Sequence, residues 1–177
     1  MRRFLDRLFD ASGAVGAVFV ALIAVLMLGQ SVMRTLGLRT GAVNDVVSWF
    51  CAAAAFFAMA HAFKHGDFVR VTLLLEKVNA PTRRALELVS LAIGCVSTAY
   101  LAWSAVQFTY ESWEFNDLAQ GLLPLPMWIP QLSFAFGSVL LLVAVVDEFI
   151  IVLRGGVPTF VRLVQERHAR GDFSSDV

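Results

Sequence analysis

The sequence predicts an all-α integral membrane protein with four transmembrane helices and one amphipathic helix at the membrane surface between the second and third spans. Three observations lead to this prediction. Apolar residues make up 58% of the 177 residues and charged residues only 16%. The mean hydropathy is +0.72. The charges stand in short clusters between long uncharged stretches. A soluble domain of this composition would lack the polar residues needed to cover its surface.

The first span is predicted at about residues 10–34. Its uncharged part, 11–33, would reach about 34 Å as a helix, enough to cross a hydrocarbon core of about 30 Å. Arg2, Arg3 and Arg7 resemble the basic start of a signal peptide. The apolar stretch is too long for a signal peptide, and no clear small-residue cleavage site follows it. We therefore expect a retained helix rather than a cleaved signal.

The other three spans are predicted at about residues 44–64, 84–110 and 128–153. They enclose the uncharged intervals that follow the first span. The fourth span starts only at residue 128, because Pro124 and Pro126 would remove backbone hydrogen bonds from a helix interior. We expect the residues just before it to form an ordered loop.

The segment 67–80 is predicted to be an amphipathic helix lying in the membrane plane. One helical face carries apolar residues, namely Phe68, Val71, Leu74, Leu75 and Val78. Arg70 lies on another face, and Arg83 and Arg84 follow just after the segment. These three arginines are candidates for contact with anionic lipid headgroups.

Basic residues set the expected orientation, because Lys and Arg concentrate in cytoplasmic loops. With the N-terminus inside, the outer side holds only Arg34 and Arg39. The cytoplasmic side then collects the other twelve: Arg2, Arg3, Arg7, Lys64, Arg70, Lys77, Arg83, Arg84, Arg154, Arg162, Arg167 and Arg170. The chain is thus predicted to be a single membrane domain, 1–177, with both termini and the tail 154–177 in the cytoplasm.

Ionisable side chains are absent from the middle of the predicted spans, where they would mark an ion or proton path. Six ionisable residues fall within a few residues of a span end: Asp45, His61, Lys64, Glu111, Asp147 and Glu148. We expect them to be solvated at the interface and paired locally, for example Asp147 with Arg154.

His61 and His65 are four residues apart, a spacing that could share a metal ion or lie near a haem edge. A transmembrane haem would need ligands from facing helices, yet the remaining histidine, His168, lies in the tail. We therefore expect no catalytic residue, no cofactor and no metal site.

Small residues at spacing four are predicted to form the seams between helices. Three such stripes occur: Gly13, Ala17 and Ala21; Ala54, Ala58 and Ala62; and Ser90, Gly94, Thr98 and Ala102. Trp103 lies deep in its span, where we expect it to pack, whereas Trp128 is expected to anchor a span end at the interface.

Two motifs make the chain similar to a known family. Residues 60–71 run from a small-residue-rich span end through Gly66 into a stretch of alternating basic and apolar residues. Residues 123–130 contain Pro126 and Trp128 in a Leu-x-x-Pro-x-Trp pattern before the last span. Both resemble the small membrane subunit of tripartite ATP-independent periplasmic (TRAP) transporters, the small permease called DctQ.

The resemblance covers most of the chain but is not complete. Family members often have His-Val or His-Ile and an aspartate in the first motif, where this chain has Phe68, Val69 and Thr72. Those family side chains are therefore not essential to a shared chemistry here. Gly66, Pro126 and Trp128 match the motifs as backbone and anchoring features.

The resemblance implies an auxiliary, non-enzymatic subunit in the bacterial inner membrane. Its partners would be a large multi-span permease, which carries the sodium and substrate sites, and a periplasmic substrate-binding protein that delivers an organic acid. The small subunit would widen and brace the fixed part of an elevator-type carrier. No nucleic-acid motif is present.

A self-contained four-helix small-molecule exporter is the alternative function. It would need an intramembrane carboxylate to couple protons, and none lies away from the predicted interfaces. A membrane anchor of a redox enzyme is excluded by the placement of the histidines.

The candidate contact residues for partners or lipid are those of the two motifs, the arginines near the amphipathic helix and the acidic loop before the fourth span. They are Gly66, Arg70, Arg83, Arg84, Glu111, Glu114, Asp117, Pro126 and Trp128. The three acidic residues face the predicted outer side, where a soluble binding protein would approach.

Overall fold

The computed structural model describes residues 2–66, 79–156, 158–159 and 161–162. Most of them lie in four α-helices: α1 (Arg2–Thr35), α2 (Val43–His65), α4 (Ala80–Glu114) and α5 (Trp128–Leu153). Each is apolar and long enough to cross a membrane. The prediction of four long apolar helices is confirmed. The amphipathic helix predicted at 67–80 falls, except for its last two residues, outside the described part of the chain.

Local sequence explains where the helices begin and end. Gly66 closes α2 with a φ of 79°, a conformation that favours glycine, and its N–H bonds back to the carbonyls of Ala62 and Phe63. A proline lies in the first turn of α4, with Asn79 before it, and Pro126 precedes α5. The prolines thus stand where a helix needs no N–H donor.

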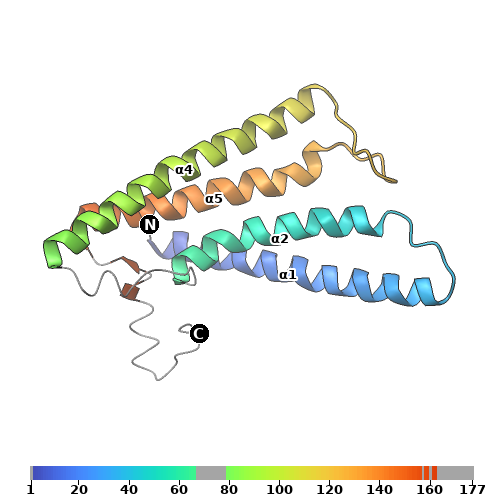
Figure 1. Ribbon diagram of the computed structural model, residues 1–177, viewed down its shortest axis with the longest axis horizontal. Coiled ribbons are helices and arrows are strands. Elements are labelled where there is room, and N and C mark those ends of the chain that lie inside the picture. Colours follow the sequence, from blue (N-terminus) through green and yellow to red (C-terminus); the bar gives the residue numbers. More distant parts are fainter. Residues whose placement is uncertain (1, 67–78, 157, 160, 163–177) are drawn as a thin grey trace, which may run out of the picture.

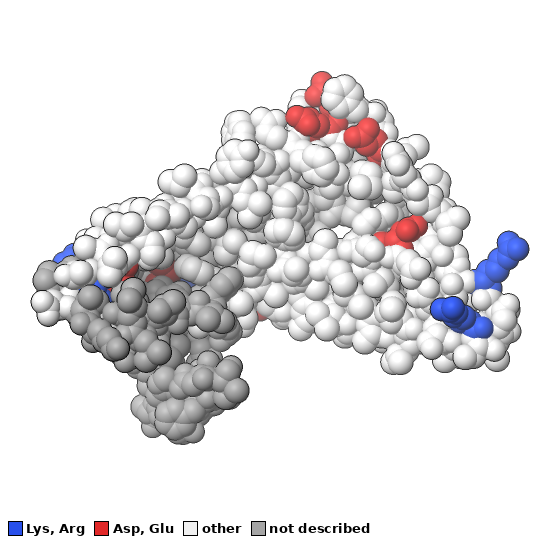
Figure 2. All heavy atoms as spheres, viewed as in Figure 1, with Lys and Arg blue, Asp and Glu red and all other residues white. Residues whose placement is uncertain are grey.

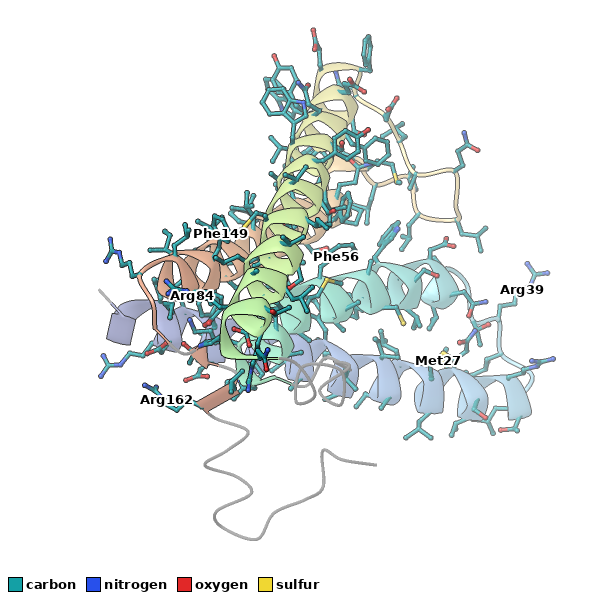
Figure 3. The ribbon with its side chains drawn as sticks, turned by 60° about the vertical axis from the view of Figure 1, so that its left-hand side comes forward. Met27, Arg39, Phe56, Arg84, Phe149 and Arg162 are labelled. Carbon is teal, nitrogen blue, oxygen red and sulfur yellow. The ribbon has the colours of Figure 1, made fainter. Side chains whose placement is uncertain are left out.

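The helices form two antiparallel hairpins, α1 with α2 and α4 with α5 (Figure 1). Contacts of α2 with α5 join the hairpins. The hairpins lie together at one end, where α2 and α5 finish, and diverge toward the loops 36–42 and 115–127 (Figures 1 and 3). We call the closed end the Gly66 end. Of the four helices, α5 is the most buried.

The seam of α1 differs from the predicted stripe. Gly16 is buried, and a Cβ there would meet Ala54 and Ala58 at 3.2 Å, whereas Ala17 and Ala21 are exposed. The prediction of a seam through Ala17 and Ala21 was wrong, because a stripe of spacing four drifts by about 40° per step around a helix of 3.6 residues per turn. The buried face of α1 instead follows alternating steps of three and four residues, as from Phe9 to Ser12 to Gly16.

The seams of α2 and α4 are closer to prediction. Ala54 is buried against α1 as expected. On α4, Ala102 is buried, and a Cβ on Gly94 would lie 3.5 Å from Val145 of α5, although Ser90 is exposed. Small residues therefore let these helices approach closely, as packing in lipid requires.

The α2–α5 contact has an aromatic centre. The rings of Phe56 (Figure 3) and Phe134 meet edge to face, with centroids 4.5 Å apart. Beside them Gly137 touches the backbone of Phe56 so closely that a Cβ would lie 2.7 Å from its carbonyl carbon. A small core of Phe9, Ala60 and Ala144 then joins α1 to both helices at the Gly66 end.

Candidate functional site

A buried ion cluster, the Lys64 junction, joins α2 to α5 at the Gly66 end. Its members are Lys64, Asp147 and Glu148. The Lys64 Nζ lies 2.5 Å from Asp147 Oδ2 and 3.1 Å from Glu148 Oε1. The side chains of Lys64 and Glu148 are only 6% and 0% exposed, and that of Asp147 is 21% exposed. Charges removed from water to this extent are stable only when paired.

These positions correct the expectation of interfacial solvation and of an Asp147–Arg154 pair. Arg154 is the exposed C-cap residue of α5, about 10 Å along the axis from Asp147. Lys64 reaches Asp147 from the packed neighbouring helix instead. The sequence places all three ionisable residues near span ends. Only the packing of α2 on α5 brings Lys64 beside the two carboxylates.

Two further contacts extend the junction. The Lys64 Nζ lies over the ring of Phe9, 5.5 Å from its centroid, which adds a cation–π contact with α1. Glu148 Oε2 accepts a hydrogen bond of 2.8 Å from the N–H of Thr159. The junction thus ties three helices and the segment after α5 to one point. It is suited to fixing the hairpins together rather than to carrying an ion, because the middle of the helices offers no continuation of charged groups.

The predicted lipid-facing arginines lie at the same end of the molecule, at the start of α4. Arg83 pairs with Glu87 at 3.1 Å, and Arg84 donates a hydrogen bond of 3.4 Å to the carbonyl of Leu153, the last residue of α5 (Figure 3). Arg70 lies outside the described residues. The contact of these arginines with headgroups stays a prediction.

The three acidic residues predicted to dock a partner lie at the opposite end from Gly66. Figure 2 shows acidic side chains over the end of α4, where Glu111 and Glu114 are exposed, and Asp117 is exposed in the loop that follows. This loop is ordered by a β-bridge between Leu118 and Pro126 and by a bond of 2.8 Å from the N–H of Met127 to the Asp117 carbonyl. The β-bridge and this hydrogen bond therefore hold the acidic loop against the Pro126–Trp128 motif.

Trp103 does not pack within this chain as expected, since it is 67% exposed. It lies on the face of α4 that lines an open groove of about 610 Å³. Tyr100, Gln107 and Glu111 continue this lining, and Phe134 contributes from α5. The groove presents aromatic and polar groups together on a predicted membrane span, which the periodicity of the sequence did not reveal.

Sequence reasoning also missed Asp10. It lies on the first turns of α1, before the uncharged stretch, and faces His61 and His65 on α2. Nothing in the spacing of the sequence relates residue 10 to residues 61 and 65, so only the packing of α1 on α2 could find it.

Comparison with known proteins identifies the family. Residues 23–155 match the family described as "Tripartite ATP-independent periplasmic transporters, DctQ component". The match begins within α1 and includes the whole of α2, α4 and α5. No curated protein matches the chain. Membership of this family implies association with other components of a transporter. The match covers most of the chain, so this chain belongs to the DctQ-component family of TRAP transporters.

Proposed function

We propose that this chain is the small auxiliary membrane subunit of a TRAP-type secondary transporter in a bacterial inner membrane, with both termini in the cytoplasm. It braces a large multi-span permease that imports an organic acid together with sodium. A periplasmic substrate-binding protein delivers the acid. The chain itself catalyses no reaction. The family match over residues 23–155 is the observation that carries this proposal.

The distribution of charge supports an auxiliary role. A carrier needs oxygen or charged ligands near the membrane midplane to replace the water around an ion or an organic acid. In this sequence no Asp, Glu, Lys or Arg lies between Asp10 and Arg34 or between Glu87 and Glu111. The buried ions of the Lys64 junction lie toward helix ends and pair with one another. The substrate and sodium sites therefore belong to the partner permease.

The shape of the molecule supports a bracing role. The hairpins diverge away from the Gly66 end (Figure 3). In the apolar stretch of α4 that could cross the membrane, only 6% of the residues are buried within the chain. Val96, Tyr100 and Trp103 of α4 are 72%, 75% and 67% exposed. Helices associate in lipid through close van der Waals packing rather than through a hydrophobic driving force. We place a helix of the large permease against the groove beside Trp103, where aromatic surface and the polar group of Gln107 are both offered.

Reconstitution tests this function directly. The chain alone in liposomes under a sodium gradient should take up no organic acid. Adding a large permease and its binding protein should produce sodium-dependent uptake, and leaving out this chain should lower that uptake. Saturable sodium-driven uptake by the chain alone would instead support the small-exporter alternative.

The acidic loop is the proposed docking surface for the binding protein. Replacing Glu111, Glu114 and Asp117 together by lysine should slow uptake most when the binding protein is limiting, because complementary charge mainly accelerates encounter. Uptake at saturating binding protein serves as the internal control. Asn116→Lys with Gln120→Lys adds charge to the same loop without removing a carboxylate, and should have the smaller effect. Equal uptake by the triple variant and the unaltered chain at limiting binding protein would remove the docking role.

A further inference from the structure

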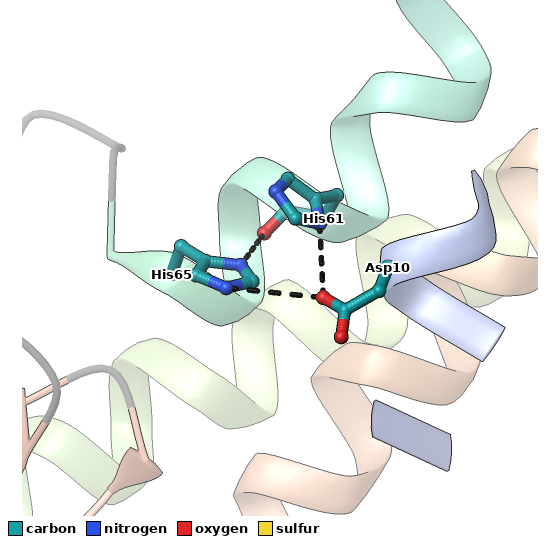
Figure 4. A group of neighbouring side chains, drawn as sticks. All are labelled: Asp10, His61 and His65. Carbon is teal, nitrogen blue, oxygen red and sulfur yellow. Dashed lines mark hydrogen bonds and ion pairs between the residues drawn. The ribbon is translucent and has the colours of Figure 1, made fainter. Parts of the chain in front are cut away.

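Three side chains with metal-ligating atoms converge where α1 crosses α2 near the Gly66 end (Figure 4). They are Asp10, His61 and His65, and their ligand atoms all lie within 4.8 Å of one another. The Asp10 Oδ1 lies 3.5 Å from His61 Nδ1 and 3.9 Å from His65 Nε2. Histidines four residues apart share one face of a helix, a spacing that proteins use to bind zinc.

The hydrogen bond of His65 sets which of its nitrogens carries the lone pair. His65 Nδ1 lies 3.0 Å from the carbonyl oxygen of His61, which can only accept, so Nδ1 is the protonated nitrogen. In the neutral ring Nε2 then presents its lone pair on the side of Asp10. Metal-binding histidines commonly donate their other N–H to a backbone carbonyl, because this fixes both the tautomer and the ring orientation.

The surroundings of His61 are a second observation that favours a bound cation. Its Nδ1 is buried and makes no hydrogen bond among the described residues. The 3.5 Å to Asp10 Oδ1 is long for a strong hydrogen bond. A buried polar atom without a partner is uncommon and calls for an explanation. A cation held between the imidazoles and the carboxylate would satisfy all three groups at once.

The geometry points to a site for one divalent transition-metal ion, with Zn²⁺ as the best fit, bound by Asp10 Oδ1, His61 Nδ1 and His65 Nε2. Zinc bonds to nitrogen and oxygen of about 2.0–2.2 Å place tetrahedral ligand atoms about 3.3–3.6 Å apart. The distances of 3.5 and 3.9 Å from Asp10 to the two imidazoles need a contraction of only a few tenths of an ångström, and the two imidazole nitrogens lie within 4.8 Å of each other. Two imidazoles with one carboxylate favour zinc over calcium or magnesium, which prefer oxygen alone.

Access and charge are compatible with this site. The Asp10 side chain is 62% exposed, which leaves a path for the ion and a fourth position for water. The nearby cation Lys64 is compensated by Asp147 and Glu148. The ion would join α1 to α2 at the end opposite the loop 36–42, so that the hairpin is closed at both ends. This inference departs from the expectation of no metal site and does not rest on the proposed transport function.

Gly13 supplies a test that keeps all three ligand residues unchanged. It lies three residues after Asp10, and a Cβ there would meet His61 Cγ at 2.6 Å and Nδ1 at 2.9 Å. The His61 imidazole therefore occupies the space that a side chain at position 13 would fill. Gly13→Ala should push the ring away from Asp10 and weaken metal binding.

The experiment uses the full chain in mild detergent, without a polyhistidine tag and with Cys51 and Cys95 replaced by alanine, so that no thiolate competes. Titration with Co²⁺, followed by visible absorption, should show a tetrahedral spectrum that saturates at about one ion per chain. Added Zn²⁺ should abolish that spectrum by displacement. Zn²⁺ should also raise the melting temperature, since a ligand of the folded state stabilises it.

The variants assign the site. Asp10→Asn, His61→Ala and His65→Ala should each weaken Co²⁺ binding by about tenfold or more, and Gly13→Ala by a smaller factor. Asp6→Asn, which removes an exposed carboxylate one turn earlier on α1, and His168→Ala, which removes the third histidine of the chain, are the matched controls and should bind like the unaltered chain. Helical circular dichroism and elution volume report whether each variant is folded.

Several outcomes would overturn the site. One is no tetrahedral spectrum from the unaltered chain at micromolar Co²⁺, which requires no variant to fold. Another is unchanged affinity in folded His61→Ala/His65→Ala protein. A melting temperature that responds to pH but not to Zn²⁺ would show that the three groups merely share a proton.

Discussion

Replacing Lys64 by methionine removes the ammonium group that bridges two carboxylates and lies over the Phe9 ring, while an unbranched apolar side chain is kept. Glu148 is 0% exposed and Asp147 21% exposed, so at least one carboxylate is left in a buried position without its cation. Breaking a buried ion pair from one side destabilises a protein by about 3–5 kcal/mol. The partial exposure of Asp147 favours the lower end, and we expect a loss of about 3 kcal/mol in the free energy of unfolding.

The measurement is equilibrium unfolding of the full chain in mixed micelles with increasing sodium dodecyl sulfate, followed by helical circular dichroism. Arg83→Met is the matched control, because the Arg83 side chain is 42% exposed in its pair with Glu87. Such a surface pair contributes about 0–1 kcal/mol.

A second variant distinguishes the effect of the unpaired carboxylates from a general loss of packing. Asp147→Asn and Glu148→Gln, added to Lys64→Met, remove the stranded charges, and the glutamine retains an oxygen that can accept the Thr159 N–H. This triple variant should regain at least half of the lost stability, as a positive coupling energy between contacting groups. If Lys64→Met costs no more than Arg83→Met, the Lys64 junction does not hold the hairpins together and the reasoning fails.

Three further outcomes are expected. A cysteine introduced at Thr40 should react with a membrane-impermeant thiol reagent in intact spheroplasts and one at Ser174 should not; the reverse pattern would overturn the orientation derived from the basic residues. Gly137→Ala should destabilise the fold by about 1–3 kcal/mol, because the new Cβ meets the Phe56 backbone, which cannot rotate away. Gly29→Ala, where nothing lies within 4 Å, should be neutral or slightly stabilising, and equal losses in both would contradict the close α2–α5 contact. The chain should co-purify with the large permease in about 1 M salt, since screening weakens exposed ion pairs but not packed apolar surfaces, and dissociation there would count against the bracing contact.

The fold class followed from the sequence because it rests on local properties. A segment that crosses lipid must satisfy its own backbone hydrogen bonds, so a sufficiently long uncharged stretch specifies a helix without reference to its neighbours. Pro126 and Gly66 likewise act through their own backbone conformations, and they mark helix boundaries in the structure as predicted. The family resemblance also rested on these local motifs, and the match over residues 23–155 confirmed it.

The faces that the helices turn to one another were decided only by tertiary structure. In a membrane the packed face and the lipid face are both apolar, so hydrophobic periodicity does not separate Gly16, which is buried, from Ala17, which is exposed.

The partners of the ionisable groups were likewise decided by packing across long separations in the chain. Lys64 meets Asp147 over 83 residues, and Asp10 meets His61 over 51. A long side chain near a span end can reach water, a headgroup or a neighbouring helix, and its sequence position is the same in each case. Which of the three it reaches depends on how α2 is rotated between α1 and α5, and that rotation is set by the close contacts of small residues such as Gly16 and Gly137.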